Sequence, residues 1–207
     1  MSKDTFFITG ISTDVGKTIV SAIITEALQA DYWKPIQAGN LDNSDTDKVQ
    51  KLISNRKTIF HKSSYALQTP ASPHLSAKLD NIEIDIEKIK RPYTDNNLVI
   101  EGAGGLLVPL NNKHTIADLI LPSDKIILVS RHYLGSINHT LLTYEALKSR
   151  GLSIFGIIFS GERNISSESI ILEKTNAKFL LQIDEEPYFD KNVISYYAEK
   201  FLEKINV

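Results

Sequence analysis

Residues 6–18 read FFITGISTDVGKT, and this stretch decides how the chain folds. An apolar run typical of a buried strand leads into a loop bounded by glycines, and a helical pattern opens directly behind it. In this context Gly16 lets the backbone approach phosphates, and Lys17 neutralises charge on their outer oxygens. The hydroxyl of Thr18 is suited to ligate Mg2+. The stretch therefore predicts a nucleotide phosphate-binding loop (P-loop).

The loop is a variant, because five residues separate Gly10 from Gly16 where the commonest P-loop has four. The alternative is a glycine turn before an amphipathic helix, with no ligand. Asp14 is unusual beside phosphates, since like charges repel, and it hints at a cationic substrate such as an amine.

Short apolar runs alternate with helical patterns along the rest of the chain. Strands are expected at residues 6–9, 32–34, 98–101, 125–130, 154–159 and 179–183. Helices are expected at residues 17–30, 45–53, 136–150, 167–176 and 191–205. This order predicts an α/β fold with a doubly wound, mostly parallel sheet, similar to P-loop NTPases, whose ligands bind at the carboxyl ends of the strands.

One segment, residues 56–92, breaks the alternation and is expected to be an insertion over the sheet, with a strand at residues 63–67. The 207 residues, 42% of them hydrophobic, suffice for one core, so we expect a single domain over residues 1–207.

Charge and composition narrow the classes of partner. The formal net charge of −2 provides no general attraction for nucleic acid or for an anionic membrane, so neither partner is expected. The chain has no cysteine, which excludes thiolate metal sites and cysteine nucleophiles. Residues 1–4 lead into the first strand without signal-peptide features, and we expect a cytoplasmic protein.

Further polar residues are expected near strand ends. Lys34 follows the second strand and could stabilise charge on a transferring phosphoryl group or a carbamate, although an isolated lysine there is usually only solvated. Asp45 and Glu101 could join Thr18 as oxygen ligands of Mg2+. Ser136 opens a long helix whose free amides could bind a substrate carboxylate, and helix capping is the plainer explanation.

These motifs together resemble those of the dethiobiotin synthetases. The resemblance rests on the variant loop 10–18 and on KP at 34–35, NSD at 43–45, SPH at 72–74, EGAGG at 101–105 and LGSINH at 134–139. It implies catalytic roles for Lys17 and Lys34 and a Mg2+ site at Thr18, Asp45 and Glu101. The implied ATP contacts are Asp14, Val15, Gly16, Lys17, Thr18, Ile19, Asp45, Glu101, Gly102, Ala103 and Gly104. The implied substrate contacts are Thr13, Ala38, Gly135, Ser136 and Asn138.

The resemblance also implies a reaction. CO2, supplied as such or as bicarbonate, is captured by one amine of 7,8-diaminononanoate, and the resulting carbamate is phosphorylated by Mg-ATP. The second amine then closes the ureido ring of dethiobiotin, a precursor of biotin. A homodimer is implied, in which the helix that follows Gly135 receives the substrate carboxylate from the neighbouring subunit.

Three departures from the family pattern affect the site. Ala38 stands where the family usually has a hydroxyl residue that contacts the substrate. Ser160 and Gly161 stand where an Asn-Asp pair near the adenine is usual, and the segment with Asp184 lacks the usual proline after isoleucine. We therefore expect Ser160, Gly161 and Asp184 to form the adenine region, with reduced selectivity for adenine.

Two other classes share this fold. A partition-type P-loop ATPase usually has an additional lysine early in the loop, and residues 11–14 provide none. A synthetase that amidates a corrinoid acid usually has an added glutaminase domain, for which this chain has no room.

Overall fold

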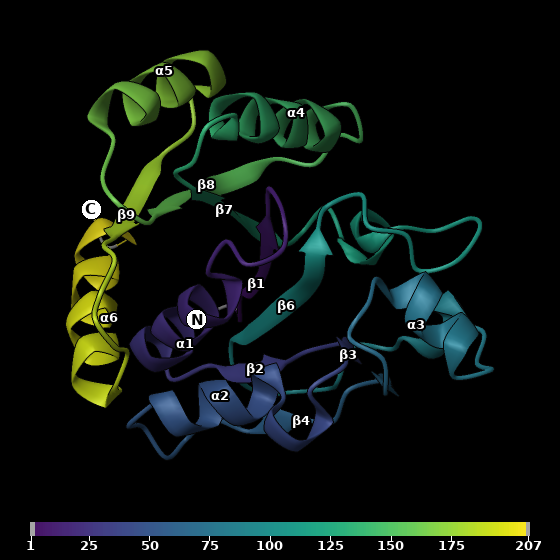
Figure 1. Ribbon diagram of the computed structural model, residues 1–207. Coiled ribbons are helices and arrows are strands. Elements are labelled where there is room, and N and C mark those ends of the chain that lie inside the picture. Colours follow the sequence, from purple (N-terminus) through teal and green to yellow (C-terminus); the bar gives the residue numbers. More distant parts are fainter. Residues whose placement is uncertain (1–2, 206–207) are drawn as a thin grey trace.

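Seven parallel strands form the central sheet of the chain in a computed structural model, which describes residues 3–205 (Figure 1). Residues 1–2 and 206–207, the ends of the expected domain, lie outside the described residues. The strand order is β4-β2-β6-β1-β7-β8-β9, and every neighbouring pair in it runs parallel. The strands are β1 (Thr5–Gly10), β2 (Asp31–Trp33), β4 (Phe60–His61), β6 (Leu98–Gly105), β7 (Lys125–Arg131), β8 (Ile154–Ser160) and β9 (Phe179–Ile183). The predicted doubly wound α/β class is confirmed.

Helices cover both faces of this sheet. On one face α1 (Lys17–Leu28), α2 (Asp45–Leu52) and α6 (Lys191–Ile205) pack against one another. On the other face α4 (Ser136–Lys148) and α5 (Ile165–Thr175) lie together beside β7 and β8 (Figure 1). No helix within residues 3–205 is both long and apolar enough to cross a lipid bilayer.

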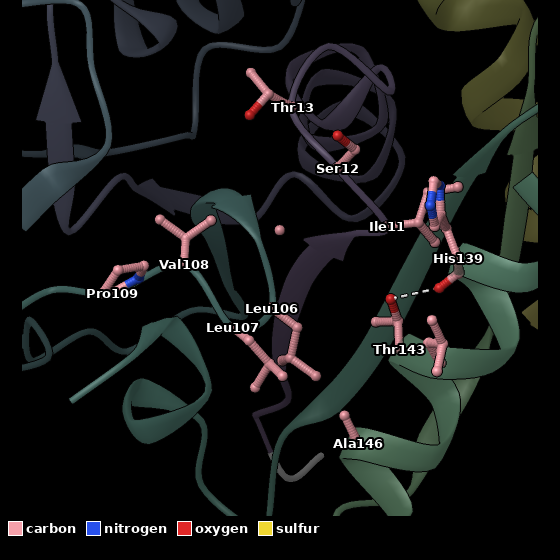
Figure 2. Close-up of a pocket in the computed structure, with 12 residues that line it drawn as sticks. Ile11, Ser12, Thr13, Leu106, Leu107, Val108, Pro109, His139, Thr143 and Ala146 are labelled. Carbon is pink, nitrogen blue, oxygen red and sulfur yellow. Dashed lines mark hydrogen bonds between the residues drawn. The ribbon is translucent and has the colours of Figure 1, made fainter. Parts of the chain in front are cut away.

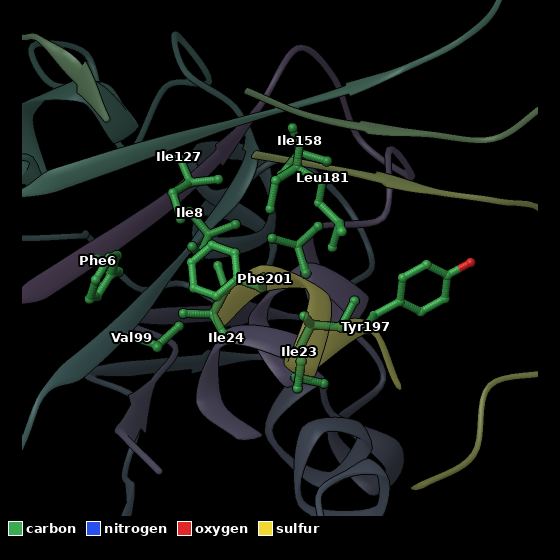
Figure 3. Packing of buried hydrophobic residues seen from close by; sticks show 14 of the residues in the cluster. Phe6, Ile8, Ile23, Ile24, Val99, Ile127, Ile158, Leu181, Tyr197 and Phe201 are labelled. Atoms are coloured by element: carbon green, nitrogen blue, oxygen red, sulfur yellow. The ribbon is translucent and has the colours of Figure 1, made fainter. Parts of the chain in front are cut away.

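The strands are apolar on both faces because both faces are covered. In β1, Phe6 and Ile8 point into the cluster formed with α1 and α6, whereas Phe7 points into the cluster on the opposite face. Figure 3 shows the first cluster, where Ile23 and Phe201 meet the side chains of the central strands. A strand with this two-sided burial holds the loop that follows it in a fixed position.

The segment of residues 56–92 is only partly an insertion. Its first strand, β4, extends the main sheet beside β2, while β5 (Tyr65–Leu67) pairs with β3 (Ile36–Ala38) in a separate two-stranded parallel sheet. The sequence prediction missed β3 and β4, because strands of two or three residues are too short to show a period. Helix α3 (Pro73–Leu79) and the 3₁₀ turn η2 (Ile86–Lys88) complete the segment.

Strand β6 is longer than predicted. It continues past Glu101 to Gly105, where it pairs with Gly10, so Glu101 lies within the strand and not at its end. Glycine weakens strand propensity, which is why the sequence suggested an earlier end. Two further 3₁₀ turns, η1 (Leu41–Asn43) and η3 (Ile116–Leu119), lie in the connections.

Candidate functional site

The loop after β1 has the backbone that a phosphate site requires. At Gly10 an added Cβ would lie 2.6 Å from Cγ2 of Val15, and Gly16 has a φ of 93°, in the left-handed region that favours glycine. Asp14 is also left-handed, with a φ of 55°. Gly16 caps α1 without a side-chain hydrogen bond, so the first amides of the helix remain available to an anion.

Lys17 begins α1 and folds back over the loop. Its Nζ donates a hydrogen bond to the carbonyl oxygen of Ser12 at 2.8 Å, and the residue is buried. Burial and then the like charge of Lys34 lower the pKa of Lys17 to about 8. The Lys17 ammonium is thus poorly solvated, so a bound anion would compensate the cost of burying its charge.

Lys34 lies buried between two carboxylates. Its Nζ is 2.7 Å from Oδ2 of Asp45 and 2.9 Å from Oε1 of Glu101, and the lysine side chain is 5% exposed. Burial alone would lower the pKa of Lys34, but the charges of Glu101 and Asp45 outweigh it and raise the pKa above its usual value. Lys34 therefore remains charged, and the prediction that it belongs to a charged site beside the loop is consistent with its position.

Glu101 is the residue on which these interactions converge. Its Oε1 accepts hydrogen bonds from Thr18 Oγ1 and Lys34 Nζ, each at 2.9 Å, and its Oε2 accepts one from Tyr32 Oη at 2.8 Å. Burial and then the Glu101 charge raise the pKa of Tyr32 well above its usual range, so the phenol keeps its proton. Sequence reasoning missed Tyr32, because a tyrosine in a buried strand ordinarily indicates core packing.

Asp45 is placed by the start of α2. Ser44 caps the helix in a reciprocal capping box with Asp47, and the backbone N–H of Asp45 donates to Oε1 of Gln37 at 3.2 Å. Burial opposes ionisation of Asp45, but the charges of Lys34 and Lys48 outweigh it and lower its pKa. Neither Gln37 nor Lys48 was predicted, although both are polar residues close to a strand end or a helix start.

A cavity of about 500 Å³ opens beside this cluster. It is bordered by Lys34 and Asp45, by Thr13 and Asp14 of the loop, and by predicted contacts from other elements, namely Ala38, Ala103 and Gly104. The methyl side chain of Ala38 brings no hydrogen-bonding group to this cavity. Most of the predicted phosphate and metal residues thus gather at one place.

The predicted adenine region lines a second cavity of about 370 Å³. Gly16 and Ile19 border it on the loop side, and Ser160, Gly161 and Asp184 border it on the side of β8 and β9. The Ser160 hydroxyl donates to the carbonyl oxygen of Val15 at 2.8 Å, so it ties the loop to β8. The two cavities therefore share the phosphate loop as a common wall.

The remaining predicted substrate residues lie elsewhere. Gly135, Ser136 and Asn138 border a cavity of about 860 Å³ at the start of α4, which does not include the phosphate loop. Between the loop and α4 lies a further cavity of about 430 Å³ (Figure 2). Its wall is largely apolar and includes Leu106, Val108 and Ala146, with Thr13 at the loop side.

Comparisons with known proteins identify the family. A family model described as an AAA domain matches residues 4–193. A protein of Christiangramia forsetii named ATP-dependent dethiobiotin synthetase BioD is 60% identical over 97% of each chain. A protein of the same name from Cytophaga hutchinsonii is 50% identical over 96% of this chain and 97% of its own length. The chain belongs to the dethiobiotin synthetase family. Dethiobiotin synthetases are enzymes, and the resemblance seen in the motifs is confirmed.

Solved structures place the dethiobiotin synthetase fold among P-loop ATPases. A plasmid partition protein of Borrelia burgdorferi bound to AMPPNP gives a TM-score of 0.59 at 16% identity, over 100% of this chain and 99% of that one. The septum site-determining protein MinD of Pyrococcus horikoshii, complexed with Mg-ADP, gives 0.56 at 18% identity over the same shares. At such identities the likeness concerns the fold alone, so the partition ATPases are relatives in architecture.

Proposed function

We propose that the chain makes dethiobiotin from 7,8-diaminononanoate, CO2 and ATP, as a ligase of biotin biosynthesis that forms C–N bonds by ring closure. The observation that carries the chemistry is the buried Lys34 ammonium, held between Asp45 and Glu101 beside the phosphate loop. A fixed cation at this place can stabilise negative charge that develops during phosphoryl transfer. Family membership supports the choice of substrates.

The proposed reaction has three steps. One amine of the substrate adds to CO2 and loses a proton, which gives a carbamate. A carbamate oxygen attacks the γ-phosphorus of ATP, the bond to ADP breaks, and a carbamic-phosphoric anhydride forms. The second amine attacks the carbonyl carbon and loses a proton, the C–O bond to phosphate breaks, and the ureido ring closes. Lys17 and Lys34 hold the phosphoryl oxygens, and no side chain forms a covalent bond.

Mg2+ fits the residues that surround Lys34. Thr18, Asp45 and Glu101 offer only hard oxygen donors, and no group of three or more His, Cys, Asp or Glu side chains suited to a metal occurs among residues 3–205. Mg2+ with a nucleotide characteristically takes one or two carboxylates and completes its shell with phosphate oxygens and water. When bound, it would neutralise charge on the phosphates. Thr18, Asp45 and Glu101 are the residues that we propose to hold it.

The nucleotide is proposed to lie along the loop from residue 14 to residue 19. Its base would enter the cavity of Ser160, Gly161 and Asp184, and its phosphates would lie against the amides at the start of α1. The backbone of residues 102–104 in β6 would border the γ-phosphate. Because Ser160 already donates to Val15, its hydroxyl has no second proton to donate to the base.

The diamine is proposed to span two subunits. Its amines would lie in the cavity of Thr13 and Ala38, and its carboxylate would meet the start of α4, at Gly135, Ser136 and Asn138, of a second copy. Exposed apolar side chains around α4 support a homodimer, since Leu134 is fully exposed and Leu142 is 60% exposed. The largely apolar cavity between the phosphate loop and α4 would suit the alkyl chain of the substrate (Figure 2).

We further propose that residues 1–207 act as one domain in the cytoplasm, where ATP and the other intermediates of biotin synthesis are available. Neither nucleic acid nor a membrane is part of the proposed function.

An isotope experiment tests the phosphoryl step. The enzyme is supplied with CO2 labelled with oxygen-18, the diamine and ATP, and the phosphate is analysed by mass before the label exchanges with water. The proposal predicts one labelled oxygen in each phosphate, because a carbamate oxygen leaves with it. Unlabelled phosphate would mean that water attacks ATP, and the proposed order of steps would be wrong.

A further inference from the structure

Tyr32 has a hydroxyl group that core packing alone does not explain. Its side chain is fully buried in β2, its ring lies 5.9 Å from the ring of Phe60, and its hydroxyl donates at 2.8 Å to Oε2 of Glu101. Glu101 itself is 1% exposed. A phenylalanine would fill the same space among these apolar neighbours, so the hydroxyl serves the carboxylate and not the packing.

The two oxygens of Glu101 have different partners. Oε1 faces Thr18 and Lys34, whereas Oε2 faces only Tyr32 among the hydrogen bonds of the described residues. A carboxylate can rotate about its Cγ–Cδ bond, and a donor fixed on one oxygen limits that rotation. The ring of Tyr32 is buried in the cluster with α1 and α6 and lies beside Phe60, and β2 is paired along both of its edges, so the hydroxyl is a fixed donor.

We propose that Tyr32 is a positioning residue for the metal-nucleotide site, which keeps Oε1 of Glu101 directed at Thr18 and Lys34. This inference rests on the part of the proposed function that assigns Mg2+ to Thr18, Asp45 and Glu101, and it is independent of the diamine. Hydrogen-bonding partners behind a metal ligand commonly change metal affinity by about 10- to 100-fold when they are removed.

The test measures ADP binding by calorimetry, first in EDTA and then with saturating Mg2+, so that no turnover occurs. The ratio of the two affinities is the Mg2+ enhancement. Tyr32→Phe removes one oxygen atom and keeps the ring, so we expect it to fold, which circular dichroism checks. We expect its affinity for ADP in EDTA to stay within about twofold of the parent, and its Mg2+ enhancement to fall about tenfold.

Tyr197→Phe is the matched control. Tyr197 is 1% exposed and donates to a carboxylate oxygen of Glu186 at 2.6 Å, at the opposite edge of the sheet. Tyr197→Phe therefore removes the same kind of phenol-carboxylate bond away from the Mg2+ residues, together with the bond that the hydroxyl accepts from the backbone N–H of Asp184 at 3.2 Å. We expect this variant to keep the Mg2+ enhancement of the parent chain, even where its overall affinity for ADP changes.

A double-mutant cycle shows whether Tyr32 acts through Glu101. In the Glu101→Gln background, Tyr32→Phe should cause no further loss of Mg2+ enhancement, because the oriented carboxylate is already gone. An unchanged enhancement in Tyr32→Phe, or an equal loss in both backgrounds, would overturn the inference. An absent enhancement in the parent chain would instead overturn the proposed metal residues, and with them the role of Tyr32.

Discussion

Replacing Lys34 by glutamine should both destabilise the chain and slow its reaction. The Lys34 ammonium contacts Asp45 at 2.7 Å and Glu101 at 2.9 Å, and Glu101 is almost wholly buried. Without the lysine, the buried carboxylate of Glu101 loses its positive partner, and the free-energy cost of removing its charge from water is no longer compensated.

The size of the effect follows from this burial. Removing one partner of a buried ion pair typically costs about 3–5 kcal/mol, and in a chain of this size 1 kcal/mol lowers Tm by about 2–4 °C, so we expect Tm to fall by about 6–20 °C. Turnover should fall about a hundredfold or more, as is typical when a preorganised charge-stabilising donor is lost. Mg2+ with ADP should restore part of the lost stability of Lys34→Gln, because the metal ion then supplies positive charge to the carboxylates of Asp45 and Glu101.

Thermal unfolding is followed by circular dichroism, in EDTA and with Mg2+ and ADP, and phosphate release is measured on the same preparations. Lys48→Gln is the control, because Lys48 pairs with the same Asp45 at 3.2 Å but its side chain is 40% exposed. An exposed pair of this kind contributes about 0–1 kcal/mol, so Tm should change little. Equal shifts in the two variants would refute the argument from burial, and near-normal turnover in Lys34→Gln would remove this lysine from the mechanism.

Three further predictions concern other parts of the site. The pKa of free Lys17 is lowered to about 8, and bound anionic phosphates should raise it, so ADP should bind with proton uptake. The affinity for ADP is then full below pH 8, where free Lys17 is charged. It should be about tenfold weaker at pH 9 than at pH 7. Calorimetry from pH 7 to 9 checks this, and Lys17→Gln should bind weakly with no such dependence; a flat profile in the parent chain would contradict it. GTP and CTP should support turnover comparable to that with ATP, because Ser160 is bonded to Val15 and Gly161 has no side chain, whereas strict use of ATP would show that other groups read the base. Gly39→Ala should destabilise the chain more than Gly151→Ala. Both glycines have a positive φ, which costs an alanine about 1–2 kcal/mol, but only at Gly39 would the new Cβ lie 2.5 Å from the Pro70 backbone. Equal Tm values for the two variants would exclude that clash.

The sequence was informative where local pattern and chemistry coincide. The stretch of residues 6–18 contains a buried strand, a glycine loop and a helix start, and all three are present in the structure as predicted. The convergence of Thr18, Lys34 and Asp45 near Glu101 also followed from their places after parallel strands.

The sequence was uninformative where a role depends on partners distant in the chain. Tyr32 reads as a core residue, and only its pairing across β2 and β6 shows that its hydroxyl meets Glu101, 69 positions away. Strands β3 and β4 have two or three residues, too few for a period of two to be visible. Gly135, Ser136 and Asn138 lie in a cavity apart from the phosphate loop, and their expected role in the site of a neighbouring subunit stays a prediction.

Product formation tests the central proposal most directly. Phosphate release from Mg-ATP and bicarbonate is measured with and without 7,8-diaminononanoate, and the product is identified by mass. We predict release that depends on the diamine and matches the dethiobiotin formed, mole for mole. ATP hydrolysis at the same rate without the diamine, with no dethiobiotin, would contradict the proposed function.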